Sequence, residues 1–209
     1  MRGFYNAAAG TVEFVTEHFS SYVVGYNKVT FSDVTAEDWY SNAVSFIAAR
    51  GITAGTGGDI FGADAELSRG QFMTMLMHAY GISPDTNAPD NFADAGSTYY
   101  TGYLAAAKRL GITQGIGGNL YAPEMPITRE DMFTLLYRTL SLLEEVPEGV
   151  SGRKLSDFSD AADVTDYANA ALQSFVGSGI ISGTSGALNP DRLTTRAEMA
   201  QVLYKLLSE

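Results

Sequence analysis

Residues 158–199 read FSDAADVTDYANAALQSFVGSGIISGTSGALNPDRLTTRAEM, and the same pattern occurs twice upstream, in residues 31–72 and 92–132. Each copy has Phe-x-Asp, an aromatic residue, a helical stretch, Gly-Ile, a glycine-rich turn, and Ser/Thr-Arg before an apolar helix. The glycine of Gly-Ile precedes that arginine by 18, 18 and 17 positions. Matches at so many offsets indicate an internal repeat, and the three copies together decide the fold.

Each repeat is predicted to form a helix, a loop and a second helix. The first helix is expected over Asp38–Arg50, Thr98–Leu110 and Asp166–Ser178, because a glycine suited to a left-handed C-terminal cap follows each of them. The glycine-rich turns also require positive φ. They precede neither Lys-Ser/Thr nor a strand-to-helix unit, so a phosphate loop is disfavoured.

The second helix of each repeat is the most apolar segment. Phe72, Met75, Leu76 and Ala79 follow an i, i+3, i+4, i+7 pattern, and residues 132–139 and 199–206 repeat it with one polar break. One repeat is too small to bury such a face alone. We therefore predict a mainly α fold, a pseudo-threefold bundle with three central helices, three first helices outside, and methionines in the core rather than in a cofactor pocket.

The chain divides at segments rich in Pro, Gly and charge, residues 83–91 and 144–154. We expect repeats over 31–90, 91–154 (with a linker) and 155–209. Residues 1–30 differ in kind, because TVEFVTEHFSSYVVGYN (11–27) is rich in β-branched and aromatic residues. This segment predicts one or two strands, the end of a preceding domain.

Composition excludes several classes of protein. The 209 residues are 45% hydrophobic, enough for a packed core, and carry a net charge of −11, which disfavours a nucleic-acid groove. No apolar run is long enough for membrane insertion. The chain contains no cysteine, so disulfides and thiolate metal sites are excluded. The N-terminus lacks the apolar core of a signal peptide. Two interpretations remain: a cytoplasmic protein, or a piece of a longer exported chain.

An arginine recurs at an unfavourable place. Thr195 and Glu198 form a predicted capping box, and Arg196 lies in the first turn, where the helix dipole disfavours a cation by roughly 0.3–1 kcal/mol. Arg69 and Arg129 hold the same position. One explanation is pairing with a nearby carboxylate, such as that of Phe-x-Asp. The other is an anion site made by guanidinium, free N–H groups and the dipole, suited to a planar carboxylate.

An aromatic residue, Trp39, Tyr99 or Tyr167, stands 12 positions before each Gly-Ile. These rings are either ordinary core or flat platforms for a sugar beside the anion site. Asp33, Asp94 and Asp160 could accept sugar hydroxyls, orient the arginines, or do both.

Together these motifs resemble the S-layer homology (SLH) domain, as a tandem triplet over about residues 31–209. The resemblance implies a pseudo-threefold helical bundle that anchors exported proteins to the bacterial cell surface. Its inter-repeat grooves would bind secondary cell-wall polysaccharide, commonly pyruvylated, and the arginines would meet the pyruvyl carboxylate. It implies no cofactor and no catalysis. The candidate glycan-binding residues are Asp33, Trp39, Gly55, Arg69, Asp94, Tyr99, Gly115, Arg129, Asp160, Tyr167, Gly183 and Arg196.

The three grooves are expected to be unequal. The first repeat has Gly70 after its arginine, which lowers helix propensity. The second has two acids, Glu130 and Asp131, directly after Arg129, and these are expected to neutralise it. Only the third carries the full Thr-Arg-Ala-Glu.

The sequence favours three other functions less. An enzyme is disfavoured, because the chain has no thiol, no Gly-x-Ser-x-Gly and no His-Glu-x-x-His, and its histidines are His18 in the strand segment and His78 on a core helix. Self-association in a surface layer through the N-terminal strands is the alternative function, although the isolated module is expected to be monomeric. Residues 160–166 are acidic but lack the glycine and closing glutamate of a calcium loop, so a solvated helix start is expected there.

Overall fold

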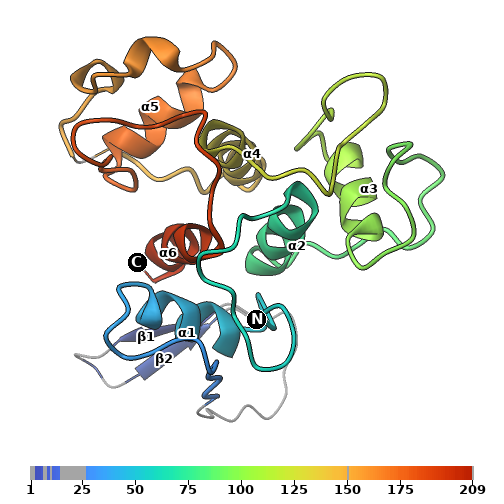
Figure 1. Cartoon of the computed structure of the whole chain (residues 1–209), viewed down its shortest axis with the longest axis horizontal. Coiled ribbons are helices and arrows are strands. Elements are labelled where there is room, and N and C mark those ends of the chain that lie inside the picture. Colours follow the sequence, from blue (N-terminus) through green and yellow to red (C-terminus); the bar gives the residue numbers. More distant parts are fainter. Residues whose placement is uncertain (1–2, 7–8, 10, 15–26, 150, 209) are drawn as a thin grey trace.

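A computed structural model describes residues 3–6, 9, 11–14, 27–149 and 151–208 of the chain. Those residues contain two strands, two short 3-10 helices and six α-helices (Figure 1). The strands are β1 (Gly3–Asn6) and β2 (Thr11–Phe14), and the 3-10 helices are η1 (Leu155–Asp157) and η2 (Ala161–Asp163). The α-helices are α1 (Ser41–Ala49), α2 (Arg69–Ala79), α3 (Thr101–Arg109), α4 (Arg129–Leu142), α5 (Asn169–Gly177) and α6 (Arg196–Leu207).

The first helix of each repeat begins three residues later than predicted. Side chains hold the preceding residues in turns: Asp38 accepts a hydrogen bond from the Thr35 N–H at 2.7 Å, and Thr101 Oγ1 accepts one from the Thr98 N–H at 2.8 Å. Such local bonds compete with helix formation. In the third repeat the expected solvated helix start is instead occupied by η2.

Helices α2, α4 and α6 surround the centre of the molecule, and α1, α3 and α5 lie outside them (Figure 1). Each outer helix packs on the central helix of the preceding repeat: α3 on α2, α5 on α4, and α1 on α6. The last pair joins the first repeat to the third. The predicted pseudo-threefold helical bundle is confirmed, and its repeats are interlocked around a ring.

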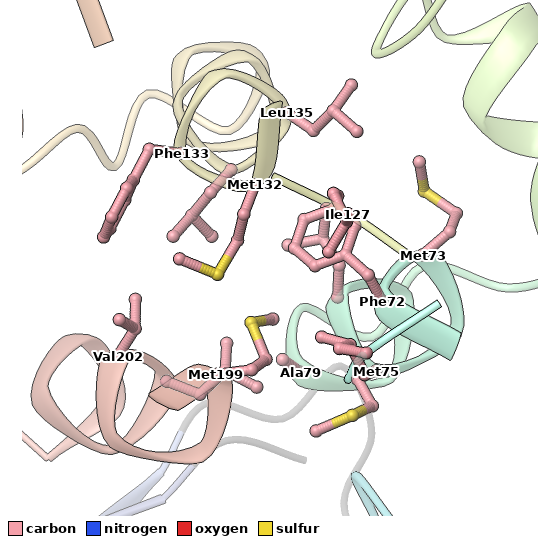
Figure 2. Close-up of a cluster of buried hydrophobic side chains, with 14 of the residues drawn as sticks. Phe72, Met73, Met75, Ala79, Ile127, Met132, Phe133, Leu135, Met199 and Val202 are labelled. Atoms are coloured by element: carbon pink, nitrogen blue, oxygen red, sulfur yellow. The ribbon is translucent and has the colours of Figure 1, made fainter. Parts of the chain in front are cut away.

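Apolar side chains fill the space between the three central helices. Phe72, Met132 and Met199 are fully buried there, and Figure 2 shows them converging from α2, α4 and α6. Of the predicted apolar positions, Leu206 is only half-buried, because it lies in the last turn of α6. The methionines of the central helices are core residues, as predicted: Met73, Met75, Met77, Met132 and Met199 are all buried.

A closed circuit of backbone hydrogen bonds joins the repeats just before the central helices. The Leu67 N–H donates to the Thr194 carbonyl at 2.8 Å, the Thr194 N–H to the Ile127 carbonyl at 3.0 Å, and the Ile127 N–H to the Leu67 carbonyl at 2.9 Å. Each repeat thus satisfies the backbone of its neighbour, so the starts of the three central helices are held in one place.

At the N-terminus, β1 and β2 form an antiparallel pair with Gly3 opposite Phe14 and Asn6 opposite Thr11. The strand prediction for residues 11–27 is confirmed for 11–14, while residues 15–26, including His18, lie outside the described residues. Among the residues described, none of the helices is long and apolar enough to cross a membrane.

Candidate functional site

The aspartate of each Phe-x-Asp holds the loop of its own repeat. Asp33 accepts hydrogen bonds from the N–H groups of Phe61 and Gly62, both at 2.8 Å. Asp94 and Asp160 bind the corresponding pairs of N–H groups at 121–122 and 188–189. Burial alone raises the pKa of Asp33, but the backbone donors outweigh it and hold the pKa below its usual value. Both oxygens of this carboxylate are therefore occupied within the repeat.

Each arginine reaches into the loop of the next repeat around the ring. The Nε–H of Arg69 donates to the Tyr121 carbonyl at 3.0 Å, that of Arg129 to Leu188 at 3.0 Å, and that of Arg196 to Phe61 at 2.8 Å. Of the two explanations for these arginines, direct pairing with the carboxylate of Phe-x-Asp is not observed, since no such ion pair joins the described residues. In each loop, one residue contacts both groups: its N–H donates to the aspartate, and its carbonyl accepts from the arginine.

The backbone N–H groups expected to be free at these helix starts are not free. Arg196 and Ala197 donate theirs to the carbonyls of Ala65 and Ala63, at 3.1 and 3.0 Å. The first N–H groups of α2 and α4 bind the equivalent loops at 123–125 and 190–192. The neighbouring repeat satisfies these donors, so an anion here would be held by side chains rather than by the helix terminus.

The arginines differ in their carboxylate partners. Arg69 forms an ion pair with Asp131. Arg129 lies 3.8 Å from Glu198, which also pairs with Arg192. Arg196 has no carboxylate within 4 Å among the residues described, and its Nη2 lies 3.3 Å from Thr53 Oγ1.

One residue per repeat explains this difference. It is the third residue of each central helix, Gln71, Asp131 or Glu198, and it lies beside the arginine of the preceding repeat around the ring. Arg69 and Arg129 therefore meet an acid, whereas Gln71 lines the same cavity as Arg196 and is neutral. The expectation that the acids of the second repeat neutralise its own Arg129 needs correction, because Asp131 pairs with Arg69 of the first repeat.

All three repeats build the cavity beside Arg196, which has a volume of about 360 Å³. The first repeat contributes Thr53, Gly55, Gln71 and His78, the second Tyr99 and the third Arg196. Burial lowers the pKa of Arg196, while Tyr99 and Asp33 act in the opposite direction. A guanidinium keeps its charge in proteins. Burial and Glu124 raise the pKa of Tyr99 despite Arg196, so its hydroxyl remains neutral.

The aromatic residues of the motif are on the surface. Trp39, Tyr99 and Tyr167 are 63%, 62% and 51% exposed, so the interpretation as ordinary core is wrong. In the second repeat the adjacent Tyr100 is the buried ring, 5% exposed, and Tyr99 stands edge-on against it with centroids 5.0 Å apart. Tyr167 differs from Tyr99, because its hydroxyl lies 2.8 Å from Asp131 and 3.0 Å from Glu130.

The glycines of the turns are required by the fold. Gly55 has φ +79°, and a Cβ there would lie 2.3 Å from the Ile60 carbonyl oxygen and 2.7 Å from the Phe31 ring. Gly115 and Gly183 are equally crowded. These residues let the loop pass close to the phenylalanine of Phe-x-Asp, and so shape the wall of the cavity.

Sequence reasoning did not single out Thr53, Gln71 or His78 as site residues. The only sequence signal for Gln71 was its alignment with two acids in the other repeats. A second cavity, of about 560 Å³, lies between α3 and residues 84–90. It contains none of the predicted site residues, and its two cations, Lys108 and Arg109, already pair with Asp90 and Asp85.

Fold and cavity together define a helical repeat module with a charged groove built where its repeats meet. The chain belongs to the S-layer homology domain family, whose model matches residues 30–73, 91–133 and 157–200. It is thus a module of the kind carried by bacterial cell-surface proteins.

Curated relatives include surface-layer proteins and enzymes. The chain is 29% identical over 176 residues to the S-layer protein sap of Bacillus anthracis, covering 84% of this chain and 21% of that protein. It is 29% identical over 209 residues to an amylopullulanase of Thermoanaerobacterium thermosulfurigenes, covering 99% of this chain and 11% of that enzyme. An exoglucanase, XynX, of Acetivibrio thermocellus is 28% identical over 183 residues, 87% of this chain and 16% of that protein. The chain therefore spans a small part of each relative, and proteins of different activities share this module.

Proposed function

We propose that this chain is a non-catalytic anchor that binds an anionic cell-wall polysaccharide, and that the groove of Arg196 is its principal site. The ligand is a sugar that carries a pyruvyl ketal. Its carboxylate pairs with the guanidinium of Arg196, and its ring rests against the exposed face of Tyr99.

One observation carries this proposal: among the described residues, Arg196 is the one repeated arginine that has no carboxylate within 4 Å, and it lines a cavity. A buried cation of this kind offers a bidentate, charge-assisted contact to an incoming carboxylate. Arg69 is already neutralised by Asp131, so an anion would first have to displace that acid. The distribution of enzymes and S-layer proteins among the relatives also favours an anchor over a catalytic domain.

The net charge of −11 does not oppose this function at short range. Repulsion between exposed charges is screened beyond about 8 Å at physiological ionic strength. The local pairing at Arg196 therefore decides the affinity, and repeated sugars along one polymer add avidity.

The test is retention on purified cell-wall sacculi that carry pyruvylated polysaccharide. Arg196→Gln should weaken retention about tenfold, equivalent to the loss of one charge-assisted contact. Arg69→Gln, the matched change at an arginine already paired with an acid, should retain most of the binding. Circular dichroism would confirm that both variants fold. Equal retention of the wild-type chain by sacculi stripped of pyruvate would overturn the proposal.

Sedimentation velocity without glycan separates this function from self-association in a surface layer. An anchor stays monomeric across concentrations, whereas a lattice module forms oligomers in the absence of wall polymer.

A further inference from the structure

The cavity beside Arg196 contains a histidine at a position where the other repeats have a permanent cation. His78 lies nine residues after Arg69, and the equivalent residues are Arg138 and Lys205. His78 is exposed and lines the same cavity as Tyr99 and Arg196. This groove thus has a titratable group in place of a fixed charge.

His78 contacts the backbone carbonyl equivalent to the one that binds Lys205 in the third repeat. Its Nδ1 lies 3.2 Å from the carbonyl oxygen of Ile52, and Lys205 Nζ donates to the equivalent carbonyl of Ile180 at 3.1 Å. On its other side, His78 Nε2 lies 2.7 Å from the Tyr103 hydroxyl of α3. The imidazole therefore takes the place of an amino group within the repeat architecture.

Both contacts are compatible with either charge state of the ring. A carbonyl only accepts, so Nδ1 carries a hydrogen, and in the neutral ring Nε2 accepts from the Tyr103 hydroxyl. In the protonated ring Nε2–H donates to the same hydroxyl oxygen, which turns its own hydrogen away. Protonation adds a charge without loss of a hydrogen bond.

We propose that His78 is the pH-dependent cation of the Arg196 groove, and that its protonation strengthens the binding of an acidic sugar as the pH falls. This inference rests on the proposed function. Histidine is the ordinary side chain that changes charge between pH 5 and 8, whereas a sugar carboxylate remains ionised throughout that range. The ligand and the proton therefore favour each other by the same factor.

The protein supplies no carboxylate beside His78 among the described residues, so the carboxylate of the ligand is the group to which its protonation is coupled. From its own helix, Gln71 and Thr74 line the cavity and are neutral. Tyr103 faces it from α3 and the Ile52 carbonyl from the loop after α1. Across the cavity lie Tyr99 and the cation Arg196, and no carboxylate lines it among the residues described.

The first test is calorimetry with a methyl glycoside that carries a pyruvyl ketal, at pH 5.5 and 8.0. The wild-type chain should bind about fivefold more tightly at pH 5.5, the lower end of ordinary coupling between sites. His78→Lys should bind tightly at both pH values, and His78→Gln weakly at both. Arg138→Gln, the matched change in the second repeat, should keep the fivefold difference in affinity between the two pH values.

If His78→Gln also bound about fivefold more tightly at pH 5.5 than at pH 8.0, the inference would be overturned, while the proposed function would remain intact. Absence of binding by every variant at both pH values would overturn the proposed function and this inference with it. The melting temperature of each variant shows whether it is folded.

The second test measures the histidine directly. In an NMR titration, with the His78 signal assigned by comparison with His78→Gln, saturating glycoside should move the titration midpoint of this ring upward by about 0.7 pH unit, the shift linked to a fivefold change in affinity. The glycoside without pyruvate should leave the midpoint unchanged. An unchanged midpoint with the pyruvylated probe bound would contradict the proposal.

Discussion

Asp33 and Arg196 meet through a single residue, Phe61. The Phe61 N–H donates to Asp33 at 2.8 Å, and the Phe61 carbonyl accepts the Nε–H of Arg196 at 2.8 Å. The same arrangement joins Asp94 to Arg69 through Tyr121, and Asp160 to Arg129 through Leu188. The aspartate of one repeat thereby positions the arginine of the preceding repeat, so the groove depends on the loop between them.

Asp33→Asn should disturb both stability and the groove. An asparagine has one carbonyl oxygen for two N–H donors, so one hydrogen bond is lost and an amino group faces a donor. We expect the free energy of unfolding to fall by about 1–2 kcal/mol. Glycan binding should weaken as well, because Phe61 no longer holds Arg196 in place. Urea denaturation and calorimetry measure the two effects.

Asp94→Asn is the matched control, because it makes the same change beside Arg69, which already pairs with Asp131. It should lower stability to a similar extent and leave binding unchanged. Equal affinity of Asp33→Asn and wild type would show that the loop does not position Arg196.

Asp131→Gln should create a second anion site. It places beside Arg69 the residue type that accompanies Arg196, and so removes the carboxylate that neutralises Arg69. We expect the binding stoichiometry to rise from one to two sugars per chain. Stability should fall by about 1–3 kcal/mol, because a charge-assisted bond to a buried arginine is lost. Calorimetry with the pyruvylated glycoside gives the stoichiometry.

Asp85→Asn weakens the ion pair with Arg109, which lies outside the groove. It should leave the stoichiometry at one. A stoichiometry of one in a folded Asp131→Gln variant would mean that the loss of the acid alone does not open the second groove.

The helical core could be predicted from the sequence because it depends on local spacing. The buried face of α2 follows from Phe72, Met75, Leu76 and Ala79, which recur at helical intervals, and all four are buried. Gly51 has φ +68°, in keeping with its place after the first helix. Three copies of one pattern then required a shared core.

The contacts of the arginines could not be predicted, because their partners are far away in the chain. Arg69 binds a carbonyl 52 positions away and Arg196 one 135 positions away. The pairing of Asp131 with Arg69 depends on which repeat follows which around the ring. Tyr99 and Tyr100 are adjacent, and the sequence around them does not indicate which of the two rings is exposed. Tyr100 turns inward because Gly70 leaves space for it: a Cβ there would lie 2.8 Å from its ring.

Gly55→Ala should be far more destabilising than Gly58→Ala. Both glycines have positive φ, but a Cβ at Gly55 would collide with the Ile60 carbonyl and the Phe31 ring. A Cβ at Gly58 would have no atom within 4 Å. Gly58→Ala should cost about 1–2 kcal/mol from backbone strain alone. Gly55→Ala should exceed this by at least about 2 kcal/mol, since the loop must move. Thermal denaturation compares the two, and equal costs would contradict the close packing at Gly55.

Acid should destabilise the fold through the loop aspartates. Burial raises the pKa values of Asp33 and Asp160, but hydrogen bonds from backbone N–H groups outweigh it and hold both pKa values below normal. The folded state therefore binds protons at these residues less readily than the unfolded chain does. Their contribution is therefore full above the unfolded pKa of about 3.9 and is lost as the pH falls through the folded pKa. The difference in stability between wild type and Asp160→Asn, measured from pH 7 to 3, should shrink below about pH 4. A difference that grows on acidification would contradict this assignment.

Thr194→Val should stabilise the protein. Thr194 is fully buried, and its hydroxyl has no hydrogen-bond partner among the described residues. In the circuit of backbone bonds its counterparts are apolar, Leu67 and Ile127. A valine of nearly the same shape removes the unpartnered hydroxyl, so we expect a gain of about 1 kcal/mol, or about 2–4 °C in Tm. Thr139→Val is the control, because the Thr139 hydroxyl donates to the Leu135 carbonyl at 2.9 Å and its loss brings no such gain. A lower Tm for Thr194→Val would show that its hydroxyl is satisfied, for example by a buried water molecule.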